Sequence, residues 1–223
     1  MKREQITTTI REKSVLKQQV YDRTHEVMQE LKEILAEYAS EVNDQIEGLD
    51  RRIKLEYRDR GKLEAQLQIA GDVLIFSMHT NVFKFDRSHP IWQNSYVEAD
   101  SSNGYCGVIN IYNFLSDSLK FNRTDDLGYL IARVFVNREK QYFVEGKRQM
   151  EYRHNNFGQG AISSQAIVDI VENAIIYALD FDLLVPPYAL SKQITVESVN
   201  TKIEMSRLKT GKRLGYQFNV EDI

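Results

Sequence analysis

The chain has 223 residues, a formal net charge of −3 and a single cysteine, Cys106. The small negative charge argues against a general nucleic-acid binder, and one cysteine excludes an internal disulfide, which fits a reducing compartment. No stretch reaches the roughly 18 apolar residues that a membrane span needs, and no signal peptide is evident, so we expect a cytoplasmic protein with no membrane partner.

Composition changes sharply near Gly71. Residues 1–70 contain 27 charged side chains, no proline and three aromatic residues, whereas residues 71–190 contain 18 of the 23 aromatic residues. This change predicts two domains. The first is a helical, coiled-coil oligomerisation arm over residues 1–70, and the second is an α+β globular module over residues 71–223 that ends in a basic tail, residues 191–223.

A stripe of apolar residues at helical spacing runs along the arm. Its members follow one another at steps of three or four: Leu31, Leu35, Tyr38, Val42, Ile46, Leu49, Ile53 and Tyr57. A phase slip at residues 58–61 indicates a kink or a short turn. One helix over residues 12–70 would be roughly 85 Å long. A stripe this narrow buries too little apolar surface alone, so we expect it to pair with a partner helix.

The charges of the arm form three blocks. Residues 1–21 carry a net charge of +3, residues 22–50 of −7 and residues 51–62 of +4. A parallel dimer in register sets the acidic block against itself, so self-association is expected to be antiparallel or staggered, with residues near 36 facing residues near 56. Two alternatives stay open: the blocks are a solvated face, or the arm folds back as a hairpin within one chain.

The globular module begins with alternating residues, which predict strands. We expect a strand or tight hairpin at residues 74–85, a strand at 107–114, and a hairpin of 130–136 with 141–145 around a polar turn. A helix capped by Ser163 or Ser164 follows, and its apolar face comprises Ile167, Ile170, Val171, Ala174, Ile175 and Ala178. The expected fold is a mostly antiparallel sheet with helices on one face, then a helical segment from residue 196 and a final strand at 216–220.

One group of charged residues suggests an enzyme. Glu145 and Lys147 form an E-x-K pair at a strand end, and Asp126 lies upstream. This pattern resembles the PD-(D/E)XK nucleases, and the resemblance implies that Asp126 and Glu145 hold Mg²⁺ while Lys147 orients the attacking water. The hairpin register argues against it, because Glu145 is predicted to lie opposite Ala132, roughly 20 Å along the strands from Asp126. The plain alternative is a charged strand end facing water.

A second group suggests a pocket for an anionic ligand. It combines basic side chains with glycines and a helix start, namely Lys147, Arg148, Arg153, Gly158, Gly160, Ser163 and Ser164. Glycines allow an anion to approach the backbone, and a helix N-terminus offers unpaired amides. Basic loops before capped helices are, however, common without any ligand.

Other reactive residues carry weaker signals. His79, Asp86 and His89 match no zinc spacing, and Cys106 reads as a small buried residue, so we expect no metal site. The sequence therefore favours a coiled-coil-assembled binding, sensory or scaffolding module that recognises a partner protein or an anionic ligand. The alternative is the Mg²⁺-dependent nuclease.

Overall fold

The computed structural model describes residues 2–50, 53–146 and 157–181, together with residues 188–193, 195–197, 199, 200 and 203 near the C-terminus. The chain forms two compact units, Met1–Phe181 and Asp182–Ile223. In the second unit, helix α7 spans Tyr188–Ser191, and the described residues from 196 to 203 are helical. The final strand predicted at residues 216–220 lies outside the described residues.

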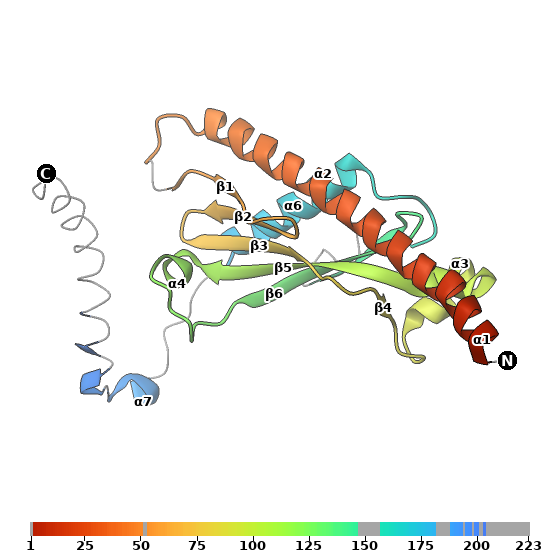
Figure 1. The fold of residues 1–223 in the computed structure, drawn as a ribbon. Helices are drawn as coiled ribbons and strands as arrows, with labels where there is room; N and C mark the ends of the chain where they lie inside the picture. Colours follow the sequence, from red (N-terminus) through yellow and green to blue (C-terminus); the bar gives the residue numbers. More distant parts are fainter. Residues whose placement is uncertain are drawn as a thin grey trace, which may run out of the picture. The chain divides into compact units, whose positions relative to one another are not determined.

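A seven-stranded antiparallel sheet is the centre of the first unit (Figure 1). The strands are β1 (Glu56–Asp59), β2 (Glu64–Ile69), β3 (Asp72–Met78), β4 (Phe83–Lys84), β5 (Tyr105–Leu115), β6 (Tyr129–Val136) and β7 (Tyr142–Gly146). Their order across the sheet is β1-β2-β3-β5-β6-β7, and β4 pairs with the start of β5. The α+β class and the mainly antiparallel sheet are therefore confirmed.

Two long helices, α2 (Val15–Gln45) and α6 (Ser164–Leu179), pack on one face of this sheet (Figure 1). Helix α6 begins as predicted, because the Ser163 hydroxyl accepts a hydrogen bond from the Ala166 amide at 3.2 Å. All six apolar residues predicted for its inner face are buried. Helix α2 contributes Val27, Met28, Leu31, Leu35 and Ala39 to the same core. Among the described residues, no helix is long and apolar enough to cross a membrane.

The chain before α2 is also helical but lies outside the core. Helix α1 (Lys2–Thr9) and a π-helical turn, η1 (Ile10–Ser14), contain no buried residue. The first buried side chain of the long helix is Leu16. The core-facing stripe of the arm therefore begins at the second residue of α2.

The predicted arm is shorter than expected, because its helix ends at Gln45. Gly48 follows with φ of +94°, a left-handed conformation that ends helices and that glycine adopts without strain. The phase slip at residues 58–61 falls at the end of β1 and the start of the turn into β2, in which Gly61 has φ of +102°. Residues 56–69, predicted as helix, are thus two strands of the sheet.

Gly71 is not a domain boundary. It lies with Ala70 in the two-residue turn that joins β2 to β3, where Ile69 pairs with Asp72. Ala70 has φ of +48°, as tight hairpin turns of this length require. Because α2, β1 and β2 all pack with the later strands, the first compact unit runs from Met1 to Phe181 rather than breaking at residue 71.

Helix α2 lies antiparallel to β1 of its own chain, but among the described residues the contacts between them are not pairs of an acidic residue from block 22–50 with a basic residue from block 51–62. The Lys32 ammonium contacts the Asp59 carboxylate at 2.9 Å and also donates to the Gly61 carbonyl. Farther along α2, the Asn43 side chain forms two hydrogen bonds with the backbone of Leu55, at 2.8 and 2.9 Å. The region near residue 36 therefore lies beside β1 of its own chain, which is the hairpin alternative.

The second face of the sheet is covered differently. Three short helices, η3 (Pro90–Gln93), α3 (Ser95–Ala99) and η4 (Ser101–Gly104), lie over one end of it. They enclose a smaller core that contains Ile91, Val97, Cys106, Val108, Phe135, Phe143 and Phe157. At the other end of β5, the chain continues into helix α4 (Ser116–Lys120) and a loop that returns to β6.

Candidate functional site

The structure does not bring the nuclease residues together. Asp126 lies in the loop after α4, where its carboxylate accepts a hydrogen bond from the Ser118 hydroxyl at 2.6 Å. Glu145 lies in β7 opposite Arg133, which is four residues beyond the start of β6. At 3.4 Å per residue, β6 spans about 14 Å from Tyr129 to Arg133, and Asp126 precedes Tyr129 in the chain. Lys147 lies outside the described residues.

The register of this hairpin corrects the sequence prediction by one residue. Asn137 bonds to Gln141 at 3.0 Å, so the loop has three residues and ends with Lys140 at φ of +56°. Three-residue hairpin loops commonly end in such a left-handed residue. Glu145 consequently faces Arg133 instead of Ala132, which places a guanidinium beside the carboxylate.

The described part of the predicted anion pocket is occupied by contacts within the chain. The Gly160 amide donates to the Gln141 side chain at 2.9 Å, and Ser163 caps α6. The Ser164 hydroxyl donates to Glu30 of α2 at 2.5 Å. Gly158, at φ of +89°, packs against the Tyr96 ring. Lys147, Arg148 and Arg153 lie outside the described residues.

The remaining candidates have local structural roles. Asp86 accepts hydrogen bonds from Ser88, and the Nδ1 atom of His79 accepts one from the Asn81 amide at 2.9 Å. Cys106 is fully buried, and this burial raises the pKa of its thiol. In the described ranges, histidine, cysteine, aspartate and glutamate side chains form no group of three that could hold a metal ion.

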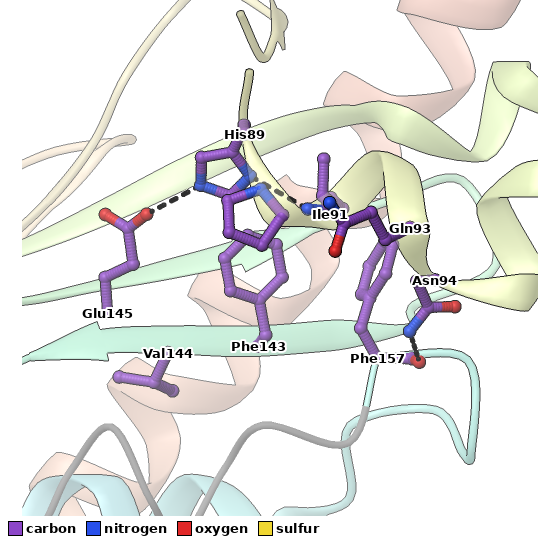
Figure 2. A pocket seen from close by; sticks show the side chains of 9 residues that line it. His89, Ile91, Gln93, Asn94, Phe143, Val144, Glu145 and Phe157 are labelled. Atoms are coloured by element: carbon purple, nitrogen blue, oxygen red, sulfur yellow. Dashed lines mark hydrogen bonds and ion pairs between the residues drawn. The ribbon is translucent and has the colours of Figure 1, made fainter. Parts of the chain in front are cut away.

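A cavity of about 390 Å³ lies between η3 and β7, and Figure 2 shows it from close by. On one side it is lined by residues 89–91, 93 and 94, and on the other by residues 143–145 and Phe157. Glu145 and His89 point toward each other across its mouth (Figure 2). We refer to this space as the His89–Glu145 cavity.

His89 is held through both ring nitrogens. Its Nδ1 atom accepts a hydrogen bond from the Ile91 amide at 3.2 Å and thereby caps η3. Its Nε2 atom lies 3.3 Å from the nearer carboxylate oxygen of Glu145. Because Nδ1 accepts, the neutral ring must carry its proton on Nε2, which then donates to Glu145.

Glu145 joins His89 to Arg133. One carboxylate oxygen faces His89, and the other accepts from the Arg133 guanidinium on the neighbouring strand. The side chains of His89 and Glu145 retain 28% and 31% of their exposure, so the pair is accessible to a ligand. A carboxylate has about four acceptor positions, and these two contacts leave capacity for further hydrogen bonds.

Phe143 and Phe157 line the cavity, and their rings and that of His89 belong to a cluster of aromatic contacts that also includes Phe85 and Phe135. The rings of Phe85 and His89 lie 4.5 Å apart, and those of Phe135 and Phe143 lie 4.8 Å apart in a stacked arrangement. Phe157 meets Phe143 edge to face at 5.3 Å. These contacts hold the rings in place, so a ligand would meet a preformed apolar surface beside the Glu145 carboxylate.

Glu145 also ends a row of polar residues that crosses the second face of the sheet. In register from β2 to β7, the row comprises Glu64, Ser77, Asn110, Arg133 and Glu145. Such a face is often simply solvated in an antiparallel sheet. The cavity at the β7 end distinguishes this row from an ordinary wet face.

Sequence reasoning found Glu145 but missed its partners. His89 was considered only as a metal ligand, and Arg133 was not singled out. A signal for Arg133 was present, since it is the only charged residue in the apolar strand of residues 129–136. The role of His89 had no comparable signal, because 56 residues separate it from Glu145.

Comparisons with known proteins do not assign this arrangement to a family. The sequence matches no protein-family model and has no significant match among curated proteins. A search of solved structures likewise found no significant match.

Proposed function

We propose that the protein is a recognition module, and that the His89–Glu145 cavity receives a flat aromatic group bearing an N–H donor, such as a tryptophan side chain of a partner protein. The observation that carries this proposal is the Glu145 carboxylate, held by Arg133 and His89 at the mouth of an aromatic-walled cavity. Tryptophan side chains are frequent anchors in interfaces because they bury a large apolar ring and donate one hydrogen bond.

The charge balance of the site favours a neutral donor over a cationic one. Arg133 already compensates the charge of Glu145, and His89 is neutral in the tautomer that caps η3. A second cation would therefore meet Arg133 as a like charge. An indole N–H has no such penalty, and its ring can pack against Phe143 and Phe157.

A titration with N-acetyl-tryptophanamide tests the proposal. We expect amide chemical shifts to move at residues 91, 93 and 143–145 in an NMR spectrum, and N-acetyl-phenylalaninamide, which lacks the ring N–H, to bind more weakly. Glu145→Ala should raise the dissociation constant about tenfold, the effect of losing one hydrogen bond to a charged group. Glu64→Ala is the matched control, because Glu64 lies in the same polar row but away from the cavity.

The proposal fails if tryptophanamide and phenylalaninamide bind alike, or if both glutamate variants bind like the wild type.

The competing nuclease class is tested by incubating the protein with supercoiled plasmid and Mg²⁺ or Mn²⁺. We expect no cleavage by the wild-type protein. Cleavage that Glu145→Ala and Lys147→Ala both abolish would instead support the nuclease.

We also propose weak self-association through the N-terminal helix, carried by Ile6, Ile10 and Val15, which are 57%, 56% and 50% exposed. Because a π-helical turn lies between Ile10 and Val15, these side chains follow one line along the helix. An antiparallel pairing of two copies about Thr8 places Ile6 of one copy beside Ile10 of the other.

Light scattering on the full chain tests the assembly. We expect a concentration-dependent dimer that is lost in the double variant Ile6→Gln, Ile10→Gln and kept in the control Ile176→Gln, another exposed helical isoleucine. A wild-type monomer at all concentrations would refute the idea.

The single, fully buried cysteine is consistent with a cytoplasmic location, which we retain as part of this proposal.

A further inference from the structure

A second cavity, of about 410 Å³, lies where the loop after α4 returns to the sheet. Its walls come from three separate parts of the chain: Arg60 directly after β1, Phe114 in β5, and residues 118–126. We refer to it as the Arg60–Arg123 cavity. None of its lining residues belongs to the His89–Glu145 cavity, so the two sites are independent.

The loop that forms this cavity is tightly organised. The Arg123 amide donates to the Ser118 carbonyl at 2.8 Å, and the Ser118 hydroxyl donates to Asp126 at 2.6 Å. Asn122 adopts a left-handed conformation with φ of +50°, which turns the chain at this point. Gly128 lies so close to the Phe114 ring that a Cβ atom there would overlap it. The cavity walls are therefore fixed without a ligand.

Two arginine residues line the space. The Nε atom of Arg60 donates to the Gln66 side chain at 2.6 Å, and Gln66 is only 3% exposed, so one edge of this guanidinium is anchored. Among the described residues, the structure gives no partner for its two terminal nitrogens. The Arg123 guanidinium lies over the Phe121 ring at 5.7 Å.

The single carboxylate in the cavity does not neutralise both arginines. Asp126 lies 3.8 Å from Arg123, beyond hydrogen-bond distance, and the same oxygen already accepts from Ser118. The lining thus holds two positive groups against one negative group. Thr124 and Asn122 add a hydroxyl and an amide that can donate hydrogen bonds.

We propose that the Arg60–Arg123 cavity binds a phosphate group. Phosphate oxygens accept paired hydrogen bonds from the planar fork of arginine, and two arginines facing one space match its double charge. The hydroxyl and amide of the loop supply neutral donors for the remaining oxygens. The polar row that ends at Glu145 takes no part in this binding, so the proposal stands apart from the recognition function above.

The assignment is tested by titrating the full chain with phosphate at constant ionic strength. Binding is followed by NMR through the amide chemical shifts of residues 118–126. We expect saturable shifts in the wild type and a dissociation constant raised about tenfold in Arg60→Gln and in Arg123→Gln, since each removes a charge-assisted contact. Arg58→Gln is the control of equal charge change, because Arg58 bonds to Glu56 and does not line the cavity. This control should bind like the wild type.

Additional arms identify the source of the phosphate. If O-phosphoserine and adenosine 5′-monophosphate compete with inorganic phosphate for binding, the cavity is a site for phosphate esters. If inorganic phosphate binds and neither ester competes with it, the cavity is a site for the free ion. No saturable shift in the wild type overturns the proposal, as does an equal loss of binding in Arg58→Gln. If Arg123→Gln lowers the melting temperature, Arg60→Gln decides the question, because Gln66 is the one hydrogen-bond partner of the Arg60 side chain among the described residues.

Discussion

Replacing Gly107 with alanine tests whether α2 belongs to the core of its own chain. Gly107 lies in β5 directly beneath α2, and an added Cβ would lie 2.8 Å from Cβ of Thr24 and 2.9 Å from its Cγ2. Thr24 is fully buried, and its hydroxyl donates to the Val20 carbonyl at 2.7 Å. Its Cβ cannot rotate away, so the helix or the strand itself must move.

The size of the effect follows from these distances. Carbon atoms in contact prefer separations of about 3.5–4.0 Å, so the two elements must separate by about 1 Å. Overpacking of this kind costs about 1–3 kcal/mol of the free energy of unfolding. For a protein of this length, that loss corresponds to a melting temperature lower by roughly 2–12 °C.

Thermal and urea unfolding of the variant, followed by circular dichroism, measures this loss. Gly71→Ala is the matched control, because an added Cβ at Gly71 meets no atom within 4 Å. In the Gly107→Ala background, Thr24→Ala should recover part of the stability, since it removes two of the three clashing atoms. A Gly107→Ala protein as stable as the wild type would refute the docking of α2 on β5.

Three further predictions concern single side chains. Leu35→Ala should lower the free energy of unfolding by about 2–5 kcal/mol in urea titrations because Leu35 is fully buried, whereas the exposed neighbour Glu37→Ala should leave it nearly unchanged. Ser163→Ala should cost about 1 kcal/mol in the same assay by removing the α6 cap, and an unchanged midpoint would contradict that role. Partial burial raises the pKa of Asp72, so its contribution to stability is greatest below the unfolded pKa and is lost as pH rises through the folded one. Asp72→Asn should therefore stabilise the protein at neutral pH, by at most about 1 kcal/mol. The new amide also offers a donor to the buried side-chain oxygen of Asn113, which has no hydrogen-bond partner among the described residues. The gain should shrink at acid pH, and a constant gain from pH 3 to pH 7 would contradict the reasoning.

Much of the local structure was readable from the sequence. The helix that begins at Ser164, its buried face and the hairpin of β6 and β7 were predicted with nearly correct bounds. The predicted end of the long helix was wrong because a single glycine, which ends a helix, was given less weight than a longer run of apolar residues at helical spacing. Gly48 ends α2, but apolar residues continue past it at helical spacing to Tyr57, so the sequence favoured a helix where the structure has β1.

The candidate sites depended far more on folding. Glu145 and Asp126 were singled out as a pair, yet each lies in a different cavity with partners that the sequence did not indicate. A three-residue hairpin loop moved Glu145 from Ala132 to Arg133. His89 reached the same carboxylate through a segment that folds over the second face of the sheet.

The sequence by itself determined the class of fold, the helix α6 with its cap, and the existence of an apolar stripe and charge blocks in the first 70 residues. These features depend on neighbours a few positions apart in the chain. Only the tertiary structure decided what covers that stripe, because an amphipathic helix requires an apolar partner without specifying whether it is another copy or its own sheet. In this chain the partner is the sheet, since the turns at Gly48, Gly61 and Gly71 bring β1, β2 and β3 back along α2.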